Sequence, residues 1–216
     1  MDEFLKSYID KYDRWFSENR ISYSSRVIPV KESLEGVKHM IPTIQARDIL
    51  AQARVITIAD CLCRSRYKNC DRPREVCFIL NGAGEQWIEK GLSKKINLDQ
   101  AGSVLKKANQ SGLVHMTLYR PDHKVFALCS CCSCCCHDLQ LVLGYGKDYI
   151  MLKSDYIARS LPEECLHCGQ CVDRCQFNAR QMTESGMVYD PEKCSGCGLC
   201  ITPCPGNAIE MNRREQ

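Results

Sequence analysis

Two matching cysteine runs near the C-terminus decide how this part of the chain folds. The first reads Cys165-Leu-His-Cys168-Gly-Gln-Cys171-Val-Asp-Arg-Cys175, and the second reads Cys194-Ser-Gly-Cys197-Gly-Leu-Cys200-Ile-Thr-Pro-Cys204. Both have the spacing CxxCxxCxxxC, and the second begins 29 residues after the first. Three cysteines on a tight loop can hold three corners of an iron–sulfur cubane, while the fourth, on a short following helix, faces a neighbouring cluster. The repeat therefore predicts two adjacent clusters.

The stretch from about Cys165 to Met211 that contains these runs resembles the bacterial two-cluster ferredoxins. The resemblance implies a ferredoxin-like domain with two [4Fe–4S] clusters and crossed fourth ligands. It implies ligands for cluster 1 at Cys165, Cys168, Cys171 and Cys204, and for cluster 2 at Cys194, Cys197, Cys200 and Cys175. The first run ends Cys175-Gln176, whereas the second keeps the proline of the family in Cys204-Pro205, so the local backbone can differ there. A pair of zinc knuckles is the alternative, but structural zinc takes its ligands in pairs.

Ten further cysteines lie upstream. They are Cys61, Cys63, Cys70, Cys77, Cys129, Cys131, Cys132, Cys134, Cys135 and Cys136. Adjacent residues of an extended chain point to opposite sides, so the dense run is expected to divide its ligands between two clusters. Ten cysteines supply two four-cysteine clusters with two left over, and the sequence leaves the partition open. A zinc site and a redox disulfide pair are the alternatives. His137 follows the run directly and is either an iron ligand, a residue that contacts the ligands without binding iron, or a surface residue.

The CxCR element from Cys61 to Arg64 and the CxCCxCCC element from Cys129 to Cys136 carry a second resemblance. Together they are similar to a cysteine-rich module that precedes ferredoxin domains in uncharacterised iron–sulfur proteins of anaerobes. This resemblance covers about Ile41 to Leu143 and implies iron–sulfur clusters without implying a reaction.

The composition agrees with metal-bound thiolates. Cysteine makes up 18 of 216 residues. The N-terminus lacks the basic start and apolar run of a signal peptide, so we expect a cytoplasmic protein, in which dense cysteine indicates metal rather than disulfides. We expect no membrane insertion. The formal charge of +3 counts every cysteine as neutral. A [4Fe–4S] cluster with four thiolates carries about −2, so four clusters would give about −5. The holoprotein is then acidic, and we expect no nucleic-acid binding.

Hydrophobic periodicity predicts an α+β protein with two domains, 1–152 and 153–216, joined by a polar stretch over 153–160. The expected N-terminal helices are Asp2–Arg20, a helix capped by Thr43 and ending near Gln52, a helical segment over 73–90, and Leu98–Asn109 with an Asn97/Gln100 capping box. The expected strands are Arg26–Val30, Val55–Ala59, Leu113–Tyr119 and Val125–Cys129. The last helix followed by a hairpin suggests a winged-helix-like N-terminal domain.

Three functions follow, in order of preference. The first is a multi-cluster electron carrier that passes low-potential electrons between redox partner proteins. The second is a reductase with a site-differentiated or unusual N-terminal cluster, and whether the chain is an enzyme stays open. The third is a redox-responsive DNA binder, motivated by the winged-helix pattern and by basic residues at Lys94, Lys95, Lys106, Lys107, Arg120 and Lys124. Ten upstream cysteines are enough to cap every iron of two cubanes, which favours the carrier.

Overall fold

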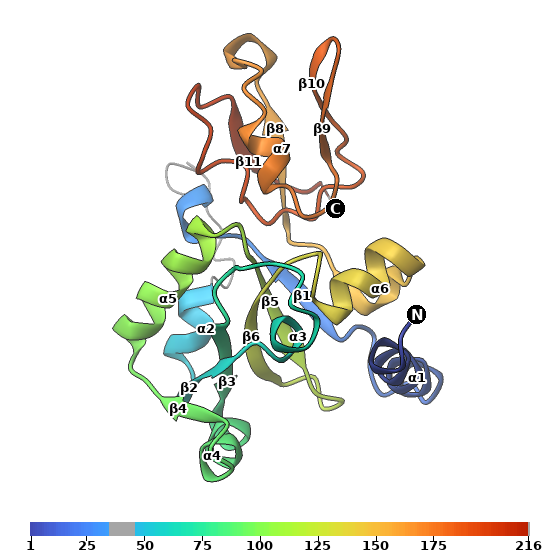
Figure 1. Cartoon of the computed structure of the whole chain (residues 1–216), viewed down its shortest axis with the longest axis vertical. Coiled ribbons are helices and arrows are strands. Elements are labelled where there is room, and N and C mark those ends of the chain that lie inside the picture. Colours follow the sequence, from blue (N-terminus) through green and yellow to red (C-terminus); the bar gives the residue numbers. More distant parts are fainter. Residues whose placement is uncertain (35–45, 216) are drawn as a thin grey trace.

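The computed structural model describes residues 1–34 and 46–215, and Figure 1 shows how the elements are arranged. The C-terminal part of the chain, from about residue 153, is named the two-cluster module after the two clusters predicted for it. It is coloured orange to red and lies at one end of a larger module built on a β-sheet. Thr43, the expected helix cap, lies outside the described residues.

A seven-stranded sheet organises the N-terminal module. Its strand order is β4-β2-β3-β6-β5-β1-β7, and all neighbours are antiparallel except the pair β1 and β7. The strands are β1 (Ser25–Ile28), β2 (Ile56–Asp60), β3 (Glu75–Leu80), β4 (Ser93–Lys95), β5 (Val114–Tyr119), β6 (Val125–Cys131) and β7 (Met151–Leu152). The central strands are rich in β-branched and aromatic residues, which fit a pleated, buried surface.

Helices cover the sheet and its ends. They are α1 (Glu3–Ser17), η1 (Lys31–Leu34), α2 (Ala46–Ala51), α3 (Leu62–Tyr67), α4 (Asn81–Glu89), α5 (Leu98–Gln110), α6 (His137–Tyr145) and η2 (Asp148–Ile150). One face of the sheet buries Ile58, Phe78 and Leu128 against α2 and α5. The amphipathic face of α1 packs on α6 through Leu5, Ile9 and Leu141. The expected capping box at the start of α5 is present.

The prediction of a helical segment over 73–90 is wrong in its first half. The structure has strand β3 from Glu75 to Leu80, and only Asn81 onwards is helical. Val76 to Leu80 are all buried between β2 and β6, and tertiary pairing on both sides outweighs the helical pattern there.

The winged-helix expectation is not confirmed. Helix α5 and the hairpin of β5 and β6 form as expected, but both strands lie inside the seven-stranded sheet, where β6 pairs with β3 and β5 pairs with β1. The hairpin is therefore not a free wing that could enter a DNA groove.

The two-cluster module consists of short elements around the cysteine runs. Strands β8 (Tyr156–Ser160) and β11 (Ile209–Arg213) pair antiparallel, as do β9 (Arg180–Thr183) and β10 (Gly186–Tyr189). The helices are η3 (Pro162–Glu164) and α7 (Gln170–Arg174). Much of the polar stretch over 153–160, expected to join the domains, is strand β8 and belongs to this module.

The second cysteine run touches the N-terminal module directly. The backbone N–H of Val30 donates a hydrogen bond to the carbonyl of Cys197 (3.0 Å). Gly198 has a φ of +74°, and a Cβ there would clash with the Ser33 side chain. The first run also makes a contact: the guanidinium of its Arg174 donates to the carbonyl of Gln110 at the end of α5 (2.7 Å). These contacts hold both runs against the sheet module.

Gly198→Ala should therefore lower the stability of the protein by at least about 1–2 kcal/mol, the cost of a left-handed conformation for a residue with a Cβ. Gly82→Ala is the matched control, because Gly82 lies at the start of α4 with open space around it. Alanine there should be neutral or stabilising by about 0.5–1 kcal/mol. Thermal unfolding midpoints of the anaerobic holoproteins measure both, and equal midpoints for the two variants would contradict the tight contact at Gly198.

No helix in the described ranges is both long and apolar enough to cross a membrane.

Candidate iron–sulfur sites

The cysteines of the two runs fall into two sets. In the first set, Cys171 interacts electrostatically with Cys204 and Cys165. In the second, Cys197 interacts with Cys200, Cys175 and Cys194. Cys204 of the second run thus lies near Cys171 of the first run, and Cys175 of the first run lies near Cys197 of the second. The crossed ligand assignment that the ferredoxin resemblance implies stays a prediction.

The loops supply hydrogen bonds to sulfur in the same way in both sets. The backbone N–H of Ala179 donates to Cys175 Sγ, and that of Ala208 donates to Cys204 Sγ, both at 3.3 Å. Gly169, Gly196 and Gly198 have positive φ, so the loop can turn tightly around the sulfurs. Burial raises the pKa of Cys200 to about 11. Such thiols ionise when a cation binds them, so cluster binding releases protons.

Exposure distinguishes the two sets. Cys168 of the first set is exposed, whereas Cys194, Cys197 and Cys200 of the second set are buried. The first set therefore reaches solvent at Cys168, and the second lies against the sheet module through Cys197.

Four upstream cysteines form one compact group, which we name the four-cysteine group. The Sγ atoms of Cys70, Cys132, Cys134 and Cys135 all lie within 4.8 Å of one another. Three of them come from the turn that follows β6, and Cys70 comes from the loop between α3 and β3. Four thiolates are a complete ligand set for a [4Fe–4S] cluster and also for structural zinc.

The other six upstream cysteines form a second group, the six-cysteine group. Its members are Cys61, Cys63, Cys77, Cys129, Cys131 and Cys136. Each thiol interacts with the next around a closed ring, in the order 61, 63, 136, 131, 129, 77 and back to 61. The ring is the largest concentration of thiols in the part of the chain that the structure describes.

Strand pairing explains this division. Cys129 and Cys131 are two residues apart on β6, so their side chains share one face of the sheet, and Cys77 on β3 lies directly opposite Cys129. Cys132 follows Cys131 and belongs to the other group. The alternation of an extended chain thus separates two adjacent cysteines into two sites.

Two arginines lie beside the four-cysteine group. Arg64, of the CxCR element, is only 2% exposed and donates to Cys132 Sγ (3.5 Å) and to the carbonyl of Ser130 (2.9 Å). Arg72 donates to Cys134 Sγ (3.8 Å). A buried guanidinium needs a negative partner, and a thiolate-ligated cluster supplies one.

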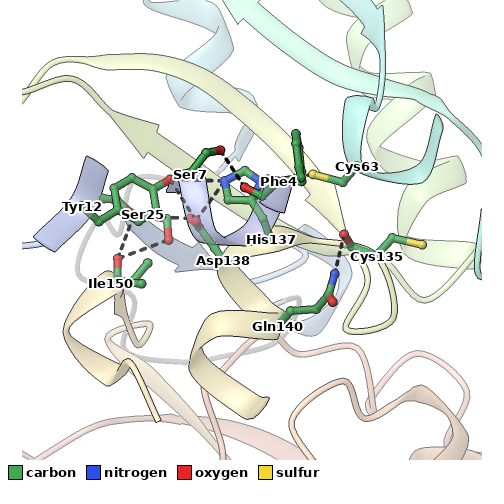
Figure 2. A network of polar contacts seen from close by, with 11 residues as sticks. Phe4, Ser7, Tyr12, Ser25, Cys63, Cys135, His137, Asp138, Gln140 and Ile150 are labelled. Carbon is green, nitrogen blue, oxygen red and sulfur yellow. Dashed lines mark hydrogen bonds and ion pairs between the residues drawn. The ribbon is translucent and has the colours of Figure 1, made fainter. Parts of the chain in front are cut away.

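His137 connects the six-cysteine group to a buried polar network, shown in Figure 2. Its Nδ1 lies 3.2 Å from Cys63 Sγ, and its Nε2 lies 3.2 Å from the Tyr12 hydroxyl and 3.1 Å from Asp138 Oδ1. The ring stacks on Tyr8 with centroids 3.7 Å apart. His137 is therefore buried, not a surface residue, and both ring nitrogens have protein partners.

Gln176 joins the second set to the four-cysteine group. Its Oε1 accepts hydrogen bonds from the backbone N–H and the hydroxyl of Ser133, both at 2.9 Å. Gln176 follows Cys175, and Ser133 lies between Cys132 and Cys134, so one side chain connects two ligand loops. The glutamine that stands where the ferredoxin pattern has proline thus makes a contact between modules.

Sequence reasoning did not identify the roles of Arg64, Arg72 and Gln176. Arg64 was visible as part of the CxCR element, and Gln176 was visible as a departure from the family pattern. Neither signal could indicate the partner, because the partner is distant in the sequence.

Comparisons with known proteins support the C-terminal assignment. Among curated proteins, none matches this chain. The family model of the 4Fe–4S dicluster domain matches residues 158–211, so the C-terminal part of the chain is similar to a ferredoxin-type domain that holds two [4Fe–4S] clusters.

Proposed function

We propose that the chain is an iron–sulfur electron-transfer protein in which the two-cluster module exchanges low-potential electrons with a redox partner protein and with clusters of the N-terminal module. The match to the 4Fe–4S dicluster domain supports two clusters in the C-terminal part. The four-cysteine group supports a third cluster, and the six-cysteine group supports a fourth.

The observation that carries this proposal is a shared core between the modules. Cys197 and Leu199 of the second run pack in one hydrophobic cluster with Cys131 and Cys136 of the six-cysteine group, and Cys175 packs against it. A second connection runs from Gln176 to Ser133 and the four-cysteine group. Cluster ligands of both modules are thus neighbours in a water-excluding interior.

The two ends of this arrangement differ in exposure. Cys168 lies at the surface, so the first cluster is the natural contact for a partner protein. The buried second set lies between that surface and the N-terminal groups. Electrons would enter at cluster 1, pass to cluster 2 and continue to the N-terminal clusters.

The experiment is metal and sulfide analysis of the full chain purified anaerobically, with a potentiometric EPR titration. We expect about sixteen iron atoms and as many sulfides per chain if four cubane-sized clusters form, and reversible one-electron reduction at potentials well below zero. About eight irons with stoichiometric zinc and no further sulfide would restrict the clusters to the C-terminal module and contradict the proposal.

A further inference from the structure

The six-cysteine group differs from the other cysteine sets because it borders a large cavity. All six of its cysteines line one cavity of about 340 Å³. The cavity beside Cys175, Cys194, Cys197 and Cys200, which form a ferredoxin-type ligand set, measures about 20 Å³. The six-cysteine group therefore has far more room than a cubane ligand set of this same chain provides. A volume of this size is in the range of small-molecule sites.

Away from the cysteines, the cavity has several aromatic walls. Tyr8, Trp15, Trp87 and Phe126 all line it. Flat apolar walls favour a flat apolar ligand, because burial against them removes apolar surface from water.

Two cations face the same cavity without carboxylate partners. The ammonium of Lys11 lies over the rings of Tyr8 (4.1 Å), Tyr12 (4.7 Å) and Trp15 (5.2 Å). The guanidinium of Arg120 lies 5.8 Å from the ring centroid of Phe126. Among the described residues, neither cation has a carboxylate oxygen within 4.0 Å.

The acids that line the cavity form no ion pair with these cations. Asp138 is fully buried and is already paired with His137 and Tyr12, so it attracts the Lys11 ammonium only at longer range. Asp60 is exposed at the end of β2. The half-buried ammonium of Lys11 therefore lacks an ion-pair partner. An anionic group of a ligand could supply one, because the attraction between opposite charges is stronger where water is partly excluded.

We propose that this cavity is the binding site for a small organic anion with a flat, apolar body, such as an aromatic carboxylate, held against an iron–sulfur centre of the six-cysteine group. The carboxylate would pair with Lys11 or Arg120, and the ring would lie among the aromatic walls. The inference rests on the proposed function, since it takes the six-cysteine group to be loaded with iron and sulfide. It adds to electron transfer a place where a small molecule meets the cluster.

The test uses the anaerobic holoprotein and benzoate as the probe. Equilibrium dialysis with labelled benzoate should show saturable binding of one molecule per chain. The same titration should shift the EPR signal of the six-cysteine centre and leave the signals of the two-cluster module unchanged. The six-cysteine signal is identified as the one that Cys131→Ala removes or alters.

Lys11→Met should weaken benzoate binding about tenfold, and Arg120→Met supplies a second test of the anion partner. Lys6→Met is the matched control, because Lys6 lies on the same helix but is exposed and outside the cavity. This variant should bind benzoate with the affinity of the unmodified protein. Absence of saturable binding, or unchanged affinity in both Lys11→Met and Arg120→Met, would overturn the inference. If either result came from protein with full iron content and reversible reduction, only the binding site would be contradicted and the electron-transfer proposal would stand. If the N-terminal module held no iron, the electron-transfer proposal would be contradicted.

Discussion

Cys132→Ala is expected to remove the cluster of the four-cysteine group, with a loss of about four iron atoms per chain. Cys132 is fully buried at the centre of that group, with its Sγ 3.9 Å from Cys70 Sγ. The variant leaves three thiolates in the group, so one iron of a cubane would have no protein ligand. Arg64, whose guanidinium reaches the same sulfur, would lose one of its negative partners in the interior, which destabilises the site further.

Cys131→Ala is the matched variant, because the two cysteines are adjacent in the sequence and both are buried, yet belong to different groups. It should remove or alter the EPR signal of the six-cysteine centre and leave the signal lost in Cys132→Ala in place. Iron analysis and EPR of the two reduced proteins measure this. Loss of the same signal in both variants would mean that the ten cysteines build one site, and the division into groups of four and six would be wrong.

The sequence predicted that the ten upstream cysteines divide between two sites, but not which cysteines belong to which site. Alternation along an extended chain indicated that the run from Cys129 to Cys136 serves two sites, and it separates Cys131 from Cys132 where β6 ends. It does not hold in the following turn, where adjacent Cys134 and Cys135 share the four-cysteine group. Membership depends on β3 lying beside β6, which places Cys77 opposite Cys129. The pattern over 73–90 was interpreted as helical, so this pairing could not be derived. The spare cysteines both fall in one group, beside the cavity, and only the tertiary structure shows this.

The C-terminal module was predictable in more detail because its information is local. Ligand spacing within each run sets the loop, and glycines mark the tight turns around the sulfurs. The contacts between modules were not predictable, since each joins residues distant in the sequence, as Gln176 joins Ser133 and Arg174 joins Gln110. The cavity has the same origin, because its walls come from α1, α4, β6 and the loop after β5.

Cys175→Ser is expected to abolish or convert the cluster held by Cys194, Cys197 and Cys200, although Cys175 belongs to the other run. The electrostatic neighbours of Cys197 include Cys175, Cys194 and Cys200, so the missing thiolate belongs to that set. The alcohol of serine is a poorer donor to iron than a thiolate, and one iron would be held weakly or lost. The EPR signal of the second cluster should disappear from the reduced protein, while that of the first cluster stays.

Matched variants decide which signal belongs to which set. Cys175→Ser should lose the same EPR signal as Cys197→Ser, and Cys204→Ser should lose the same signal as Cys165→Ser, because the fourth ligands cross between the runs. If Cys175→Ser instead matched Cys165→Ser, each run would supply all four ligands of its own cluster. Cys175 would then not hold the cluster that packs against Cys131 and Cys136, and the path for electrons through the shared core would have to start from Cys197 alone. The comparison therefore tests the ligand assignment and the connection between modules together.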